Sequence, residues 1–480
     1  MAYSMLSRNH SILLAFYLIA TCMLAWISRN DPFFWDTVQL GSKHAHFFYE
    51  NGLHWIPLPQ DIDSGHPPVF GYYLAMVWTV FGKSLLTGHV AMLPFLFANT
   101  GLLWLIGRKI AGDTWGAWLP LLVLADPVLL GQSVMISPDI VVTTGFLLSV
   151  YAVLANRKIL LSLGVLMLCA ISMRGMMTAA AIGVWAIFLS QKQTFDLKPA
   201  VKTALYFLPG FVFASWFLWW HYSSTGWLGY HPESPWARAF SRVDLQGFIR
   251  NIAVLGWRWL DFGRIAEIIA LVILLPVFVK RKLVPFTWQK LQIQPVLVLF
   301  GLLLLFLSPS ALLYENLSAH RYFLPAFIGL HFLVIQLISS SIKSIRFSKS
   351  LFVIMVVMLF GCNWWIYPRG ISMDWDSTLA HRPYHSLRAL AIQFIDEHHI
   401  DFKEVGSAFP NLNTGESLML NGDSRQFSPK NYKLNKYILT SNVFNDLGEN
   451  DYEILERDWS LIWRNTKNGV WMELYKKPVE

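Results

Sequence analysis

The chain has 480 residues, of which 55% are hydrophobic and only 14% are charged, with a formal net charge of +8. Several apolar runs reach the roughly 17 to 25 residues that a helix needs to cross a hydrocarbon core of about 30 Å, which excludes an ordinary soluble globular protein. The composition therefore predicts a polytopic α-helical membrane protein. The positive charge requires no nucleic acid partner, because most of it lies in short loops between the apolar runs.

About eleven membrane-spanning helices are predicted, although short adjoining runs can be divided differently. In chain order the predicted spans are Ser11 to Ile27, Leu85 to Ile106, Trp115 to Gln132, Ile140 to Leu154, Ile159 to Ile171, Met176 to Leu189, Ala204 to Trp220, Ile265 to Val279, Val296 to Leu313, Phe323 to Ile338 and Leu351 to Ile366. The first span is expected to be a retained anchor, because no small-residue cleavage signature follows it. All three cysteines fall inside predicted spans, a pattern that indicates no disulfide framework.

Basic residues set the orientation of these spans. Counted through the chain, one side carries the clusters Arg108/Lys109, Arg157/Lys158, Lys192/Lys198/Lys202, Lys280/Arg281/Lys282/Lys290 and Lys343/Arg346/Lys349, together with Arg8. Loops rich in Lys and Arg face the cytoplasm. The long first loop (residues 30–84) and everything after Tyr367 are therefore predicted to face outward, which in a bacterial inner membrane is the periplasm.

Two outward segments have their own structural patterns. Val69 to Phe81 is apolar, too short to span, and preceded by Pro67 and Pro68, so it is predicted to be an interfacial helix. After Tyr367 the hydropathy falls, and residues 370–480 are predicted to form a small soluble α/β domain beside a transmembrane domain of residues 1–369. This domain is expected to contain a helix with Leu387, Leu390, Ala391, Phe394 and Ile395 on one face, and strands at Tyr437 to Leu439, Ser460 to Trp463 and Val470 to Tyr475. A turn at Lys467-Asn468-Gly469 joins the last two strands.

Two aspartates mark the candidate site. Asp36 follows the first span and Asp139 begins a later one, on the same predicted face of the membrane. A carboxylate at a membrane boundary is costly unless a polar or cationic group uses it. His66, Arg174 and Arg321 are predicted to lie at that face too, which indicates a polar site there.

The order of short motifs resembles the polytopic GT-C type glycosyltransferases, in particular the protein O-mannosyltransferase and aminoarabinose transferase group. The matching elements are Asp36 soon after the first span, His66-Pro67-Pro68-Val69 at the end of the first outer loop, Ser137-Pro138-Asp139, and Arg321-Tyr322-Phe323-Leu324-Pro325 at a late helix. Together they cover roughly residues 10 to 370. Mannosyltransferases usually carry an Asp-Glu pair in the first loop, whereas Thr37 follows Asp36 here, so a protein acceptor is not implied.

The resemblance implies transfer of a sugar from a polyprenyl or dolichyl phosphate to a lipid, glycan or protein acceptor, with inversion at the sugar carbon. A phosphate leaving group is already anionic, so a single base can suffice. We assign Asp36 as the base, Asp139 to acceptor orientation or a metal, and His66, Arg174 and Arg321 to the donor phosphate. Trp35 and Asp63 are assigned to the sugar or acceptor. A divalent metal is compatible with two carboxylates but not required.

Each residue also has a structural alternative. Asp36 could be a solvated loop acid, Asp139 an N-cap, and His66 a cap of the Pro-Pro helix. Arg174 could be a snorkelling cation and Arg321 an interface anchor, while His320 is expected to be structural. Trp35 could belong to the aromatic belt of the membrane interface.

Two other classes of function compete with a transferase. A transporter or flippase of a lipid-linked intermediate predicts polar groups at mid-bilayer and symmetric halves with broken helices. The charges of this chain instead concentrate at one face, and its halves show no repeat. A receptor or scaffold would leave the His-Pro-Pro loop unexplained.

Overall fold

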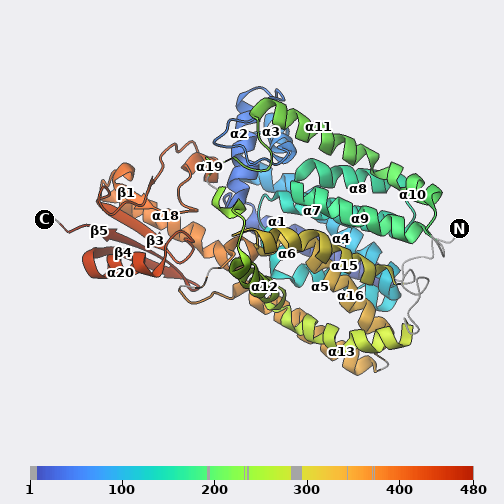
Figure 1. Ribbon diagram of the computed structural model, residues 1–480. Helices are drawn as coiled ribbons and strands as arrows, with labels where there is room; N and C mark the ends of the chain where they lie inside the picture. Colours follow the sequence, from blue (N-terminus) through green and yellow to red (C-terminus); the bar gives the residue numbers. More distant parts are fainter. Residues whose placement is uncertain are drawn as a thin grey trace.

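The computed structural model of the protein is a helical bundle with a small mixed sheet at one end (Figure 1). It describes residues 8–191, 195–231, 233–234, 237–282, 294–342, 344–369, 371 and 373–478. The predicted basic residues Lys192, Lys290 and Lys343 lie outside the described residues.

Most helices of the bundle are joined by short connections, whereas residues 51–68 form a long one. They are α1 (Arg8–Ser28), α2 (His44–Glu50), α3 (Val69–Phe81), α4 (Leu85–Gly116), α5 (Leu119–Ala125), α6 (Pro127–Ser133), α7 (Pro138–Leu154), α8 (Lys158–Ile171), α9 (Met173–Ser190), α10 (Leu197–Ala204), α11 (Leu208–Thr225), α12 (Leu245–Leu260), α13 (Ile265–Lys282), α15 (Pro295–Leu313), α16 (Leu324–Ser341) and α17 (Ile345–Gly361). A π-helix, η1 (Val38–Lys43), precedes α2, and 3-10 turns include η2 (Leu205–Phe207), η3 (Ala237–Phe240), η4 (His320–Phe323) and η5 (Cys362–Trp364).

The protein is an integral membrane protein by the length and composition of its helices. Within the described residues, seven helices are long and apolar enough to cross a membrane, or up to nine if two bent helix pairs each count as one span. The prediction of eleven is higher because two of its runs are short or broken here. The run from Trp115 to Gln132 is divided into α5 and α6 at Asp126, which caps α6 ahead of Pro127, and α8 has only 14 residues.

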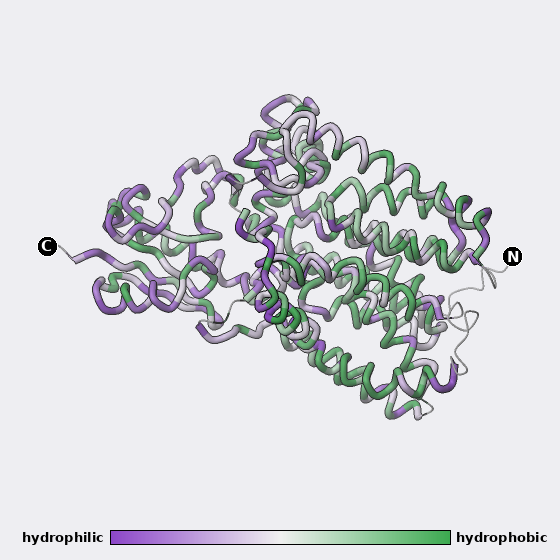
Figure 2. Tube along the Cα trace, viewed as in Figure 1, coloured by the Kyte–Doolittle hydropathy of each residue, from purple (hydrophilic) through white to green (hydrophobic). Residues whose placement is uncertain are grey.

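The helix α16 forms the centre of the bundle. Its apolar window is 83% buried, against 11–50% for the other six long helices. It packs against α4, α13 and α15, and the arginine that precedes it is therefore held at the end of the most enclosed helix. Figure 2 shows that the bundle helices are largely hydrophobic, whereas the sheet region is mixed.

A buried ionic network joins the α5–α6 break to neighbouring helices. Arg264 Nη1 lies 2.9 Å from Asp126 Oδ2, and His331 lies between Asp126 and Glu267, with Nδ1 2.7 Å from Glu267 Oε1. Arg264 and His331 have no solvent exposure. The cluster therefore ties α6, α13 and α16 together inside the bundle.

Several local sequence predictions are confirmed. The helix α3 has the predicted bounds Val69–Phe81. The predicted hairpin is formed by β4 (Ser460–Lys467) and β5 (Val470–Lys476), and both turn residues, Asn468 and Gly469, have positive φ, as a tight hairpin turn requires.

The C-terminal elements form a five-stranded mixed sheet in the order β2-β1-β3-β5-β4, parallel among the first three strands and antiparallel among the last three. Its remaining elements are η6 (Trp375–Ser377), η7 (Leu379–His381), α18 (Arg382–Glu397), η8 (Phe402–Glu404), β1 (Val405–Ser407), α19 (Gly415–Met419), β2 (Ser428–Pro429), β3 (Tyr437–Ser441) and α20 (Glu449–Asp458). The helix α18 packs on β4 and β5 through a face that includes Leu387, Ala391 and Ile395, but Leu390 is exposed.

The sheet region contacts the first outer loop directly. Arg382 forms two hydrogen bonds to Asp31, with Nε 2.7 Å from Oδ2 and Nη2 3.1 Å from Oδ1. Glu416 of α19 pairs with His46, at 3.0 Å, and with Lys83. In Figure 1, α19 accordingly lies beside α2 and α3. The first loop and the C-terminal region thus meet on the same end of the bundle.

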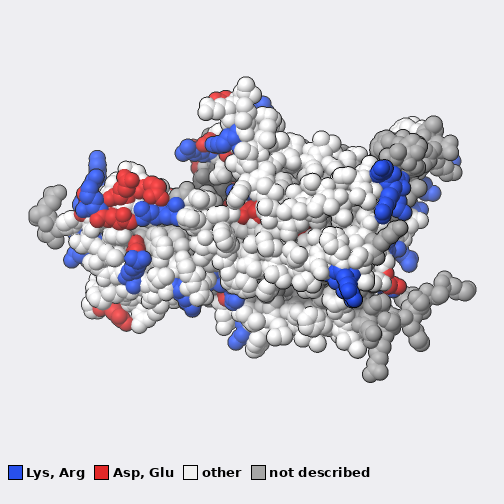
Figure 3. Space-filling model, turned by 90° about the horizontal axis from the view of Figure 1, so that it is seen from below, with Lys and Arg blue, Asp and Glu red and all other residues white. Residues whose placement is uncertain are grey.

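Charged side chains are distributed unevenly along the molecule. Figure 3 shows Lys and Arg at the bundle end far from the sheet, a broad band of uncharged surface, and both signs of charge around the sheet. A hydrocarbon core accommodates such a band with polar ends on either side.

Candidate active site

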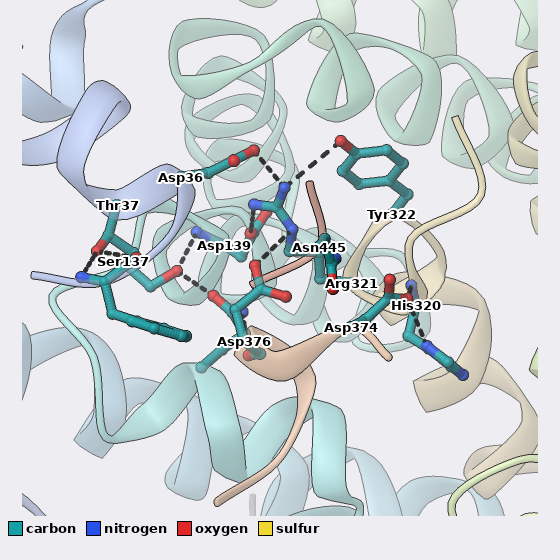
Figure 4. A network of polar contacts seen from close by, with 12 residues as sticks. Asp36, Thr37, Ser137, Asp139, His320, Arg321, Tyr322, Asp374, Asp376 and Asn445 are labelled. Carbon is teal, nitrogen blue, oxygen red and sulfur yellow. Dashed lines mark hydrogen bonds and ion pairs between the residues drawn. The ribbon is translucent and has the colours of Figure 1, made fainter. Parts of the chain in front are cut away.

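Arg321 is the centre of a cluster of three carboxylates at the end of the bundle that faces the sheet (Figure 4). Its Nη2 contacts Asp36 Oδ2, its Nη1 lies 3.7 Å from Asp139 Oδ2, and its Nε lies 2.9 Å from Asp376 Oδ2. The Arg321 side chain is only 4% exposed. A cation so enclosed, with three acidic partners, is more than an interface anchor.

Local structure fixes the position of Asp36. The chain leaves α1 and turns at Phe34, whose N–H donates to Thr37 Oγ1 (2.9 Å) while the Thr37 hydroxyl donates to Phe34 O (2.7 Å). Trp35 within this turn has a φ of 56°. The turn directs Asp36 toward Arg321, and its side chain keeps 24% exposure, the largest of the three carboxylates.

Asp139 lies in the first turn of α7. Ser137 is the N-cap of this helix and accepts a hydrogen bond from the Asp139 N–H (3.2 Å), so the alternative that Asp139 itself is the cap is wrong. A carboxylate near a helix N-terminus is stabilised by the helix dipole. Its Oδ2 is nevertheless buried without a hydrogen-bond partner among the described residues, so this oxygen remains available to a ligand.

Asp376 is the carboxylate that the sequence analysis missed. It belongs to η6, after the last membrane-spanning helix, and its side chain is 3% exposed. Burial and the nearby carboxylates of Asp36, Asp374 and Asp139 raise the pKa of Asp376 to about 7, although Arg321 acts in the opposite direction. One signal was available: Trp375-Asp376 after the last span repeats the Trp35-Asp36 dipeptide after the first.

His320 has a structural position next to this cluster. Its Nδ1 lies 2.6 Å from Asp374 Oδ2 and its Nε2 lies 3.1 Å from Asp261 Oδ2. Arg258 Nη2 is 3.5 Å from the same Asp374 oxygen. The imidazole therefore joins the segment before α16 to the C-terminal region, in agreement with the structural role expected for it.

Arg174 lies beside the cluster and, unlike Arg321, has no acidic partner among the described residues. Its guanidinium carbon lies 3.7 Å from the ring centroid of Tyr322, and no carboxylate of the described chain forms an ion pair with it. Its Nη1 is buried without a hydrogen-bond partner among the same residues. A half-buried guanidinium without a neighbouring carboxylate is expected to bind an anion, and the planar N–H fork suits phosphate.

His66 lies close to Arg174. Its Nδ1 accepts a hydrogen bond from the Met173 N–H (3.4 Å), and α3 has no side-chain cap, so His66 does not cap that helix. Burial and the Arg174 guanidinium lower the pKa of His66 to about 3. The ring is therefore neutral at pH 7 and, with Nδ1 accepting, offers an Nε2–H donor rather than a positive charge.

Two narrow cavities connect these groups. One is lined by His66, Asp139 and Arg174, and the other by Asp139, Arg174, Arg321 and Tyr322. Asp139 and Arg174 belong to both. The side chains that the sequence assigns to binding the donor and the acceptor therefore line the same cavities.

Trp35 and Asp63 do not join the cluster around Arg321. Trp35 packs edge-on against Phe409, with ring centroids 4.7 Å apart. Asp63 accepts hydrogen bonds from the Gly65 N–H (2.8 Å) and pairs with His221 Nε2 (2.9 Å), so both of its oxygens have structural partners. It lines a different cavity, which shares only His66 with the first.

The side chains of the cluster do not form a site for a divalent metal among the described residues. No group of three or more His, Cys, Asp or Glu in the described part of the chain could hold a metal ion. The three site carboxylates point instead at Arg321, whose guanidinium stands where a shared cation would be needed. No step below is therefore derived through a metal.

Two solved structures share the fold of this chain. ArnT from Cupriavidus metallidurans bound to undecaprenyl phosphate aligns with a TM-score of 0.51 and 12% identity, over 73% of this chain and 64% of that chain. The same protein in the apo state aligns with a TM-score of 0.52 and 11% identity, over 75% and 67% of the two chains. This chain thus spans slightly less than two thirds of the first structure. No protein-family model and no curated protein matches the sequence.

The structural match confirms the fold expected from the motifs. This chain shares the fold of ArnT over the aligned part, and its own helical bundle carries a C-terminal mixed sheet.

Proposed function

We propose that this protein is a glycosyltransferase that moves a sugar from a polyprenyl phosphate to an acceptor hydroxyl or phosphate. The observation that carries the proposal is Arg174, a half-buried guanidinium that shares a cavity with Asp139 and Arg321 and forms no ion pair with a carboxylate of the described residues. Its need for an anion is met by a lipid phosphate. The fold supports this donor class, because the similar ArnT structure binds undecaprenyl phosphate.

In the proposed reaction, the bond between the sugar C1 and the phosphate oxygen breaks as the acceptor oxygen bonds to C1 from the opposite face. The acceptor proton passes to Asp36, the most exposed carboxylate of the cluster. The electron pair of the broken bond stays on the polyprenyl phosphate. Arg174, the Nε2–H of His66 and the positive charge of Arg321, which borders the same cavity as Arg174, stabilise this charge, while Asp139 orients the acceptor.

We further propose that the site faces the periplasm of a bacterial inner membrane. The site lies at the bundle end that carries the sheet, and the basic end lies opposite (Figure 3). Because basic loops stay in the cytoplasm, this arrangement exposes the site to the outer leaflet. The lipid donor would then enter from that leaflet beside the first loop.

Purified full-length protein in liposomes tests the proposal directly. Undecaprenyl phosphate carrying aminoarabinose, mannose or another single sugar is supplied as donor, and release of undecaprenyl phosphate is measured by mass spectrometry. We expect release from at least one donor that depends on acceptor and on Asp36. Lipid movement across the bilayer without any such release would favour the flippase alternative instead.

A further inference from the structure

We propose that Asp376 is a positioning residue of the transferase site, and that its charge regulates how tightly the site holds the donor phosphate. The inference rests on the proposed function. It makes the C-terminal region a working part of the site, since Asp376 lies beyond the last membrane-spanning helix.

The geometry assigns Asp376 to Arg321 and not to the substrate. Each nitrogen of the guanidinium faces a different carboxylate: Nη2 faces Asp36, Nη1 faces Asp139 and Nε faces Asp376, at 2.9 Å. Figure 4 shows the three acids around the guanidinium. The side chain of Asp376 is 3% exposed against 24% for Asp36, so an acceptor reaches Asp36 while Asp376 acts through Arg321.

The backbone around Asp376 is held rigidly against α6. Gln132 Nε2 donates to the Asp376 carbonyl oxygen (2.8 Å), and Gln132 in turn accepts from the Ser137 hydroxyl. At Gly131 an added Cβ would lie only 2.8 Å from the Thr378 nitrogen, so the two backbones are in close contact. This packing places Asp376 at the Nε edge of Arg321, and it links the segment to the N-cap of α7 that positions Asp139.

The ionisation of Asp376 is proposed to have a second effect, on the binding of the donor phosphate. The charged groups that face it are Arg321, Asp36, Asp139 and Asp374. With a pKa of about 7, Asp376 changes from mostly neutral to mostly ionised between pH 6 and pH 8. The ionised form adds a negative charge behind Arg321 and so weakens the hold on a phosphate. Two unit charges roughly 8 Å apart at an effective dielectric constant of about 20 change an affinity about 30-fold, and screening reduces this.

Two substitutions separate positioning from charge. In Asp376→Asn a polar oxygen still lies beside Arg321 Nε, but the ionisable group is gone. In Asp376→Ala both are lost. Asp458→Asn is the matched control, because Asp458 belongs to the same C-terminal region and, among the described residues, pairs only with its exposed neighbour Arg457 (2.7 Å).

Binding of undecaprenyl phosphate to full-length protein is measured at pH 6 and pH 8, together with donor KM and kcat. The titration of the lipid phosphate itself is common to all variants, so the ratio of dissociation constants, pH 8 over pH 6, is compared between proteins. We expect this ratio to be about threefold or more larger in the wild type and in Asp458→Asn than in Asp376→Asn. We expect Asp376→Ala to lose about tenfold or more in kcat at both pH values, with an unchanged melting profile.

Equal ratios in the wild type and Asp376→Asn would overturn the regulation by charge. Full kcat in Asp376→Ala would overturn the positioning role. Failure of the proposed function has a different signature, because the wild type would then release no undecaprenyl phosphate from any donor, whereas the binding ratios would still report on Asp376.

Discussion

Replacement of Arg174 by methionine is the sharpest test of the phosphate site. Arg321 is a poorer probe, because Arg321→Ala would leave three buried carboxylates without their cation, a change that costs about 3–5 kcal/mol of stability for a single buried pair. Arg174 has no acidic partner in the described chain, so its removal strands no charge. Its only described aromatic contact, the stack on Tyr322, contributes about 0.5–2 kcal/mol.

The expected magnitude follows from the lost contact. A hydrogen bond to a charged group contributes about 1.5–3 kcal/mol, which corresponds to about a 10- to 150-fold loss in kcat/KM for the donor. Arg174→Lys keeps the charge without the planar fork, so its loss should be smaller than that of Arg174→Met. The kinetics are measured with a polyprenyl phosphate sugar at saturating acceptor, so that the measured kcat/KM refers to the donor alone.

Arg238→Met is the control for this experiment. The Arg238 side chain is 88% exposed and pairs with Glu315 at 3.3 Å, so its removal should change donor kcat/KM by no more than about fivefold. If Arg174→Met and Arg238→Met had equal donor kinetics, Arg174 would be a packing residue on Tyr322, and the main support for the phosphate site would be lost.

Three further outcomes are expected. Asp36→Asn should lower transfer to a hydroxyl acceptor by about a hundredfold to ten-thousandfold, while donor binding is retained. The loss in transfer should be smaller for a phosphate acceptor, which needs no deprotonation. Near-normal turnover of a hydroxyl acceptor would show that another residue is the base. Arg264→Met should lower stability by about 3–5 kcal/mol, seen as a lower melting temperature in detergent, because it removes the arginine partner of the buried Asp126 and leaves His331, 3.4 Å away, beside it; an unchanged melting temperature would contradict this. A reporter fused after Glu480 should be active only outside the cytoplasm, and cytoplasmic activity would reverse the proposed orientation.

Much of the site could be predicted from the sequence because membrane spans constrain position. Once apolar runs are counted, Asp36, Asp139 and Arg321 each fall at a span boundary on one face, and the structure brings all three together. Arg174 lies beside them for the same reason. The apolar period likewise located α3, and the Asn468-Gly469 turn located the last hairpin.

Other parts of the site could not be derived in this way. Asp376 follows the last span in a polar region where no apolar period limits the fold, so only tertiary packing on Gly131 and Gln132 brings it to Arg321. Asp63 lies in the expected loop, but its oxygens are taken by Gly65 and His221, which a one-dimensional pattern does not reveal.

Hydropathy also failed to predict the helix boundaries at a place where a buried ion pair stabilises a charged residue inside the bundle. The run from Trp115 to Gln132 reads as one span, yet Asp126 interrupts it because Arg264 and His331 from distant helices neutralise the carboxylate inside the bundle. In α18 the polar Arg388 is buried with Nε 2.6 Å from Asn411 Oδ1, while Leu390 faces outward. The burial of these polar residues depends on contacts with residues that are remote in the sequence.

The place of Asp376 in the chain has a consequence for the order of biosynthesis. Asp36 is made early, Arg321 follows 285 residues later, and Asp376 emerges only after the last long helix has left the ribosome. A nascent chain that stops between Arg321 and Asp376 holds Arg321 without its Nε partner and without the segment that packs on α6. Premature products, even with every membrane helix inserted, would therefore lack the complete arrangement of charges around Arg321.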